Sequence, residues 1–244
     1  MTAERHRTEN QESRADQEGG CAMSRGLLSL GEQLRYLVQD RALSATTMRV
    51  PKHSHIYNCG ERDGNIYLVE SGQVRTVSLS RDGKRCLLSV YTDGDVFGEL
   101  CILRENRIET ATAMTPVALR RIPKTRLLEA VAEAGLQGAF IRHLTGRLSE
   151  QQQIITTLVT MDSEQRLATI LLRLARKLGK RQGEYLCIVE RISQEELAWM
   201  VGTTRSRVGY FLKRFHDAGF VRRTRESYLL VHEELLTGYV QKLM

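Results

Sequence analysis

The chain lacks several features, and each absence excludes a class of protein. No apolar run approaches the roughly 18 residues that a membrane-spanning helix needs, and the N-terminus has no apolar signal core. The five cysteines are odd in number and form no C-x-x-C pair. This usage is typical of reduced thiols, so the sequence predicts a cytoplasmic protein.

Positive charge is present and unevenly placed. The formal net charge of the 244 residues is +7, and residues 161–244 hold 15 Lys or Arg against 10 Asp or Glu. Most of the excess therefore lies in the last third of the chain. A domain that binds phosphate groups needs such a surface.

The most informative stretch reads ISQEELAWMVGTTRSRVGYFLKRF and predicts two short helices joined by a tight turn. Ser193 followed by Glu196 forms a capping box, which predicts that the first helix begins there. Gly202 supplies the turn. Thr203 or Thr204 is the expected cap of the second helix.

The second helix is predicted to have two unlike faces. Its buried face would contain Val208, Phe211, Leu212 and Phe215. Its outward face would contain Arg205, Ser206, Arg207, Tyr210, Lys213 and Arg214. This pattern is typical of a helix-turn-helix, which places its second helix in the DNA major groove. The alternative is an ordinary helical hairpin with a solvated basic face.

Short apolar runs alternate with glycine turns between about residues 45 and 123. The predicted strands are Asn65–Val69, Gln73–Leu79, Arg85–Tyr91 and Ala118–Ile122. Asp82-Gly83 and Asp93-Gly94 predict hairpins, because glycine accepts the positive φ of such turns. Strands at this spacing predict a small β-barrel or jelly roll.

Residues 124–179 are predicted to be helical and to contain a dimer seam. The seam positions alternate by three and four: Ile141, Leu144, Leu148, Gln151, Ile155 and Leu158. A long helix with such a seam needs a partner, and a two-fold homodimer is the simplest one. The polar Gln151 either sets the register of the seam or contacts a ligand at the dimer axis.

The remaining pattern completes an α+β architecture. A helix is expected from about Ser163 to Leu178, a strand at Tyr185–Val189, and a small β wing at Phe220–Arg223 and Tyr228–Val231. Four parts follow: a disordered tail (1–25), a β-roll effector-binding domain (26–135), a dimerisation helix (136–160) and a winged helix-turn-helix domain (161–244). Met23 is an alternative start to Met1.

This order of parts resembles the cyclic-AMP receptor protein and fumarate–nitrate reductase regulator superfamily over about residues 28–235. Phe97-Gly98-Glu99-Leu100 resembles the phosphate-binding cassette of that family. Gly202-Thr203-Thr204-Arg205 with Val208-Gly209 resembles the start of its recognition helix, and Arg166 near the hinge also fits. The resemblance implies a DNA-binding transcription regulator and not an enzyme.

The resemblance also implies a cyclic-AMP pocket built on Gly98, Glu99 and Leu100, with Arg107 at the position of the phosphate-binding arginine. Helix N-termini and arginine suit a phosphate on physical grounds. Ile108 replaces an expected Ser or Thr, and Glu109 adds a negative charge. The adenine-contacting positions of the dimer helix are Gln151 and Gln152. The pocket is therefore expected to be weak or altered, and no metal is expected.

The same resemblance assigns the DNA contacts. They are Thr203, Thr204, Arg205, Ser206, Arg207, Tyr210 and Lys213. Arg205 matches a guanine reader, whereas Ser206 replaces a Glu that would accept a hydrogen bond from cytosine. The expected partners are a second copy of the chain, a pseudo-palindromic double-stranded DNA site and, as a candidate, RNA polymerase.

Two alternatives remain open at this point. His53 and His55, with Cys59 and Glu61, suggest a metal-dependent jelly-roll enzyme of the cupin type, but no suitable third histidine follows. Cys101 lies within the cassette and suggests a regulator that responds to oxidation or nitrosation. The four-cysteine pattern of iron–sulfur members is absent.

Overall fold

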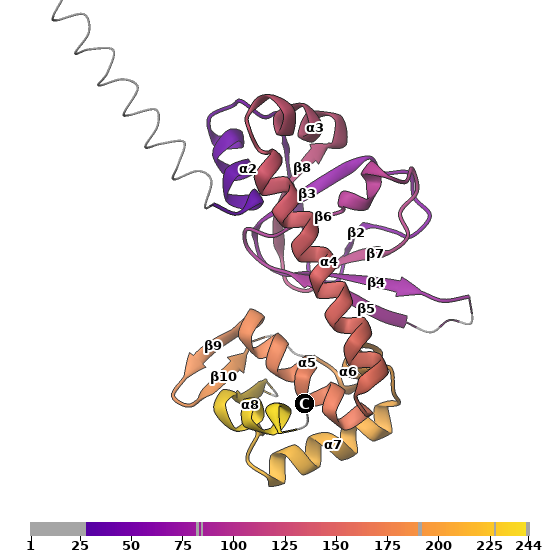
Figure 1. Ribbon diagram of the computed structural model, residues 1–244, viewed down its shortest axis with the longest axis vertical. Coiled ribbons are helices and arrows are strands. Elements are labelled where there is room, and N and C mark those ends of the chain that lie inside the picture. The colour runs from indigo at the N-terminus through magenta and orange to yellow at the C-terminus, as the bar shows by residue number, and fades with distance from the viewer. Residues whose placement is uncertain (1–27, 82, 84, 190–191, 227, 243–244) are drawn as a thin grey trace, which may run out of the picture.

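The structure is a computed structural model that describes residues 28–242 except 82, 84, 190, 191 and 227. A β-roll occupies one end of the molecule, a small helical domain the other, and the long helix α4 (Gln137–Thr160) runs between them (Figure 1). Within the described residues, no helix is long and apolar enough to cross a membrane. The predicted tail, residues 1–25, lies outside them.

The β-roll consists of two four-stranded antiparallel sheets. The first has the order β1 (Thr46–Val50), β8 (Val117–Pro123), β3 (Asn65–Ser71) and β6 (Val96–Phe97). The second has the order β2 (His55–Tyr57), β7 (Thr110–Ala113), β4 (Val74–Leu79) and β5 (Arg85–Tyr91). Buried residues of both sheets form one core, which includes the ring stack of Tyr67, Phe97 and Tyr91.

One predicted turn connects the sheets and does not form a hairpin. Asp93-Gly94 joins β5 to β6, and these strands belong to different sheets. The hairpin predicted there is wrong, although Gly94 has the expected positive φ of 85°. The other predicted hairpin joins β4 to β5, which do pair, and Gly83 has a φ of 80°. Asp82 lies outside the described residues.

Helices close the end of the β-roll and continue into the dimer helix. Helix α2 (Leu30–Gln39) begins with a capping box made by Ser29 and Glu32. The short 3-10 helix η1 (Glu99–Ile102) follows Gly98, and α3 (Lys124–Glu133) precedes α4. A second apolar core joins α2, α3 and the start of α4 to the first sheet.

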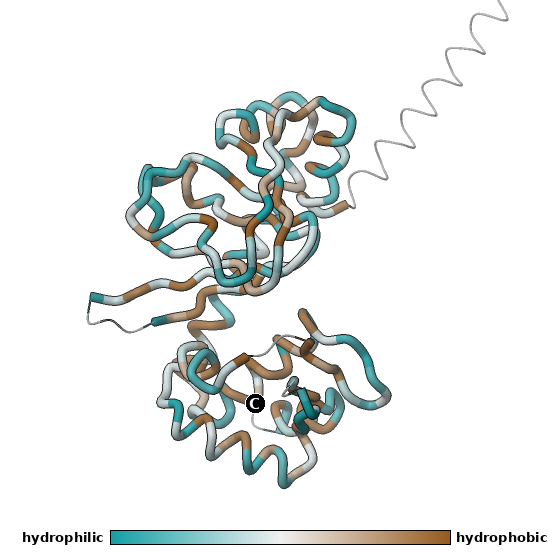
Figure 2. Tube along the Cα trace, turned by 180° about the vertical axis from the view of Figure 1, so that it is seen from behind, coloured by the Kyte–Doolittle hydropathy of each residue, from teal (hydrophilic) through white to brown (hydrophobic). Residues whose placement is uncertain are grey.

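The C-terminal domain is the predicted winged helix-turn-helix. Its helices are α5 (Ser163–Leu178), α6 (Gln194–Val201), α7 (Arg205–Asp217) and α8 (Glu233–Gln241). Its sheet has the order β11 (Val221–Arg223), β12 (Leu229–His232), β10 (Tyr185–Ile188) and β9 (Gly179–Gln182). Helix α5 has nine buried residues, most of which belong to the apolar core of this domain. Hydrophilic and hydrophobic segments alternate along α7 (Figure 2).

Candidate nucleic-acid interface and ligand pocket

Local hydrogen bonds fix both helices of the helix-turn-helix. The Ser193 hydroxyl accepts from the Glu196 N–H at 3.1 Å, and the Glu196 carboxylate accepts from the Ser193 N–H at 2.8 Å. Helix α6 ends at Gly202, which has a φ of 69° and so adopts a backbone conformation that favours glycine. Thr204 caps α7 by accepting from the Arg207 N–H. The turn between the helices is therefore built from residues 202–204.

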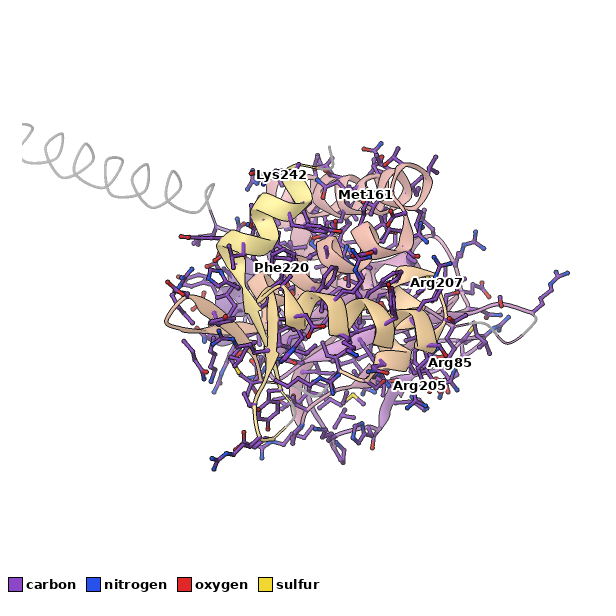
Figure 3. All side chains as sticks on the ribbon, turned by 90° about the horizontal axis from the view of Figure 1, so that it is seen from below. Arg85, Met161, Arg205, Arg207, Phe220 and Lys242 are labelled. Carbon is purple, nitrogen blue, oxygen red and sulfur yellow. The ribbon has the colours of Figure 1, made fainter. Side chains whose placement is uncertain are left out.

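Helix α7 divides its side chains as the sequence predicts. Its buried residues are Val208, Phe211, Leu212 and Phe215. Its exposed residues include Arg205, Ser206, Arg207, Tyr210 and Lys213. Figure 3, which views the molecule from below, shows Arg205 and Arg207 near one end of α7. Thr203 and Thr204 lie immediately before that end, so all seven predicted DNA-contacting residues lie on one continuous segment.

Arg214 has a structural partner within the domain. Its Nη1 lies 2.7 Å from Oε2 of Glu164 on α5, although its side chain remains 56% exposed. The pair ties the end of α7 to the start of α5. Arg166 does the same for α6: its Nε donates to the Val201 carbonyl at 2.8 Å, and its Nη1 donates to the Met161 carbonyl at 2.7 Å. Both arginines orient the helix-turn-helix relative to the hinge after α4.

Sequence reasoning missed the basic residues of the wing. Arg222 and Arg223 on β11 are exposed, and so is Arg225 in the turn that follows. A cleft of about 340 Å³ separates α7 from the wing, and Lys213 and Arg223 lie in its lining. The sequence run Arg222-Arg223-Thr224-Arg225 was the available signal for this second basic surface.

The cassette region forms a turn with a left-handed glycine. Gly98 has a φ of 85°, and a Cβ there would lie 3.0 Å from Nη1 of Arg107. Both backbone conformation and space therefore require glycine at this position. Glu99 begins η1 directly after it, and Leu100 is 39% exposed.

Arg107 lies beside Gly98 but its guanidinium is already engaged. It is 3% exposed, and it donates to the Gly98 carbonyl at 2.6 Å, to the Asn65 carbonyl and to Oδ2 of Asp63 at 2.8 Å. The guanidinium also stacks over the Tyr57 ring, with its Cζ 4.0 Å from the ring centroid. Burial raises the pKa of Asp63, but hydrogen bonds from Arg107, Tyr67 and Asn65 outweigh it and keep that pKa low. Asp63 is thus an internal anion for Arg107.

Glu109 is a second buried carboxylate close to this group. It is 5% exposed, and its Oε1 accepts from the Tyr57 hydroxyl at 3.0 Å. Its Oε2 has no hydrogen-bond partner within the described part of the chain. Burial raises the pKa of Glu109, and the bond from Tyr57 and the charge of Arg107 offset only part of the effect. Ile108, between these residues, is 43% exposed.

Two residues of α4 pair with the cassette, and neither was predicted. Nε of Arg147 lies 3.4 Å from Oε1 of Glu99, and the same guanidinium donates to the Tyr91 hydroxyl at 2.7 Å and to the Ser89 hydroxyl at 3.1 Å. Nε2 of His143 lies 3.9 Å from the same Glu99 oxygen. A cation of α4 therefore contacts the residue that the resemblance assigns to a nucleotide.

The two predicted glutamines lie further along α4. Gln151 is half-buried and Gln152 is exposed. The apolar seam residues on this helix are exposed, and Ile141, Leu148 and Ile155 are each about 60% exposed. A run of large apolar side chains with this exposure is unusual for a surface that stays in contact with solvent.

The cysteine and histidine candidates have ordinary surroundings. Cys101 is 2% exposed, and burial raises the pKa of its thiol, which lowers its reactivity toward oxidants. Nδ1 of His55 lies 2.9 Å from the Thr112 hydroxyl, and His53 is exposed at a positive φ of 69°. Among residues that the structure describes, no group of three His, Cys, Asp or Glu could hold a metal ion.

Comparison with known proteins agrees with both halves of this architecture. A family model of the cyclic nucleotide-binding domain matches residues 47–134, and one of the Crp-like helix-turn-helix domain matches residues 165–238. The chain belongs to the cyclic-AMP receptor protein and fumarate–nitrate reductase regulator superfamily. The predicted fold class is confirmed.

Relatives of this superfamily cover most of the chain. It is 29% identical over 206 residues to a CRP-like cAMP-activated global transcriptional regulator of Mycobacterium tuberculosis (strain ATCC 25618 / H37Rv), covering 82% of this chain and 92% of that protein. It is 28% identical over 170 residues to a global nitrogen regulator of Synechococcus elongatus, with 68% and 77% covered. A transcriptional regulator of the CRP family from Thermus thermophilus superposes with a TM-score of 0.68 at 26% identity, covering 80% of this chain and 96% of that one.

These comparisons decide between the classes considered above. The matching proteins are transcription regulators, so the protein is a DNA-binding regulator of this superfamily and not a cupin-type enzyme.

Proposed function

We propose that the protein is a homodimeric transcription regulator that reads a pseudo-palindromic DNA site through α7 and is linked to cyclic AMP through an altered pocket. The observation that carries the proposal is the exposed polar face of α7, from Arg205 to Lys213, beside a basic wing. Arg205 is at the N-terminal end of the helix, the end that reaches base edges in a helix-turn-helix complex. An arginine there suits guanine.

The α4 seam supports a dimer. Its apolar residues are exposed, although they recur at the spacing of a coiled-coil interface. A second copy of α4 would cover them. A dimer carries two recognition helices, and these suit half-sites about 34 Å apart, or one turn of DNA. RNA polymerase stays a candidate partner.

The cyclic-AMP link rests on the cassette and on the relative in Mycobacterium tuberculosis that is described as cAMP-activated. Gly98 and Glu99 match the family pattern. Arg107 is held by Asp63, and a buried Glu109 lies where added negative charge opposes a phosphate. Weak nucleotide binding is therefore expected, because the anion must compete with carboxylates that are already in place.

One experiment tests this function in two steps. Sites selected from random double-stranded DNA by the purified protein should share a two-fold symmetric motif, and failure to enrich any motif would reject the proposed function. The selected site is then titrated with and without cyclic AMP, while calorimetry measures nucleotide binding directly.

The variant Ile108→Ser tests the altered pocket. It restores a hydroxyl beside Arg107, and a regained hydrogen bond to a charged phosphate is worth about 1.5–3 kcal/mol, or roughly ten- to a hundredfold in affinity. Calorimetric titration of cyclic AMP should therefore give a tighter complex than wild type. If neither wild type nor Ile108→Ser gives a heat of binding at high nucleotide concentration, cyclic AMP is excluded as the ligand. Altered DNA affinity on oxidation would then point to a cysteine thiol, and the exposed candidates among the described residues are Cys59 and Cys86.

A further inference from the structure

Helix α6 packs on strand β5 of the same chain. Leu87 and Val90 of β5 belong to one buried apolar cluster with Leu197 and Val201 of α6. Val77 on β4 and Met200 on α6 add partly buried surface to it. The apolar core of the DNA-binding domain therefore continues into the β-roll, and the two domains share more than the hinge at Met161–Asp162. In Figure 1 the β4–β5 hairpin lies directly beside α6.

An ion pair crosses this contact at α6. Nη1 of Arg75 on β4 pairs with Oε1 of Glu196, and the two side chains are only 22% and 17% exposed. The other carboxylate oxygen of Glu196 accepts the capping-box hydrogen bonds from Ser193. One carboxylate thus fixes the start of the helix-turn-helix and attaches it to the β-roll.

Two further contacts flank the pair. The guanidinium of Arg85 lies over the Trp199 ring of α6, with its Cζ 5.0 Å from the centroid. Nζ of Lys177 on α5 lies 2.9 Å from Oδ2 of Asp95 in the β5–β6 connection. Contacts at separate points restrain rotation of one domain against the other, which a hinge alone does not do.

The contact leaves the DNA-reading face uncovered. It uses α6 and α5, whereas Arg205, Ser206, Arg207 and Tyr210 on α7 are all exposed. Figure 3 shows Arg205 and Arg207 at the outer surface of the lower domain. The docked arrangement is therefore compatible with DNA binding, and does not mask the recognition helix.

We propose that this α6–β5 docking surface, held by Arg75–Glu196 and Arg85–Trp199, preorganises the recognition helix for DNA. The inference rests on the proposed function and adds how the spacing of the two DNA-binding domains of the dimer is set. DNA-binding domains that rotate about the hinge lose orientational freedom when both half-sites are bound, and this loss weakens DNA binding. DNA-binding domains docked on their β-rolls have lost this orientational freedom before binding DNA. They therefore accept a narrower range of half-site spacings.

Trp199 provides a direct readout, because it is the only tryptophan in the chain. The variants are Arg75→Gln, Arg85→Gln and their combination. Arg62→Gln is a matched control, since Arg62 pairs with Glu105 on the same domain but both side chains are more than 75% exposed. Arg75→Lys keeps the charge and should retain most of the docking. Circular dichroism verifies that each variant is folded.

Acrylamide quenching of Trp199 and affinity for a DNA site selected by the wild-type protein are then measured. The double variant should give a clearly larger quenching constant and DNA binding weaker by about five- to tenfold. It should also discriminate less than wild type between the selected site and one with an extra base pair between half-sites. Arg62→Gln should match wild type in all three measurements.

Other outcomes overturn the proposal in distinct ways. Unchanged quenching in the double variant means that the domains do not dock through these residues. Increased quenching with tighter DNA binding means that docking opposes DNA binding, and unchanged spacing discrimination means that docking does not set the geometry. If no DNA site can be selected, the proposed function fails, while the quenching result still reports on docking.

Discussion

Replacing Arg107 with methionine should destabilise the β-roll strongly, with no nucleotide present. The guanidinium makes hydrogen bonds to Asp63, Gly98 and Asn65, and the side chains of Arg107 and Asp63 are only 2% and 12% exposed. Removing one member of a buried ion pair leaves the other charge uncompensated, which costs about 3–5 kcal/mol. Methionine fills similar volume, so the loss reports on charge and hydrogen bonds more than on a cavity.

Urea unfolding followed by circular dichroism measures the free energy of unfolding of wild type and of Arg107→Met. Tryptophan fluorescence is unsuitable, because Trp199 lies on α6 in the other domain. The control Arg126→Met removes a pair with Glu129 in which both side chains are more than half exposed, so it should change stability by less than about 1 kcal/mol.

The pH dependence gives a second check with a defined sign. The pKa of Asp63 is lowered in the folded protein, so its interaction contributes stability above the unfolded-state pKa of about 3.9. That contribution is lost as the pH falls through the folded-state value. The difference between wild type and Arg107→Met should therefore shrink in acid. A loss below about 1 kcal/mol at neutral pH, or a difference that grows in acid, would refute the structural role of Arg107.

Two other predictions concern the seam and the second buried carboxylate. Leu148→Glu places a charge in the proposed α4 seam and should cost several kcal/mol of dimer stability; sedimentation as a dimer equal to wild type would reject the seam. Glu109→Gln keeps an acceptor for Tyr57 and removes a buried charge with a raised pKa. Such a carboxylate opposes folding as the pH rises through its folded-state pKa, so the variant should gain stability over wild type toward neutral pH. A gain only in acid would contradict this assignment.

The helix-turn-helix could be predicted from sequence because its determinants are local. The Ser193–Glu196 capping box, Gly202 and the apolar spacing of α7 lie within one segment, and each forms as expected. The four strands predicted in the β-roll were found for the same reason, since their apolar runs are bounded by turns. Helix α2 was missed although Ser29 and Glu32 form the same kind of box. Strands β1, β2, β6, β7 and β9 were missed because they are at most five residues long and carry no comparable signal.

Pairing between distant segments could not be predicted in the same way. Asp93-Gly94 has the local chemistry of a hairpin turn, but whether the flanking strands pair depends on contacts elsewhere in the sheets. The site shows the same limit. The position of Arg107 beside Gly98 followed from the family pattern, but its engagement depends on Asp63, 44 residues earlier in the chain. The contact of Arg147 with Glu99 spans 48 residues and had no sequence signal.

The salt-dependent DNA affinities of two variants test most directly whether α7 reads DNA sequence. Arg205→Ala should cost about 1–3 kcal/mol on the selected site and relax the preference at one guanine. Lys213→Ala, as the loss of a phosphate contact, should weaken selected and scrambled sites alike and reduce the salt slope by about one. Equal and sequence-independent losses from both variants would contradict base reading by Arg205.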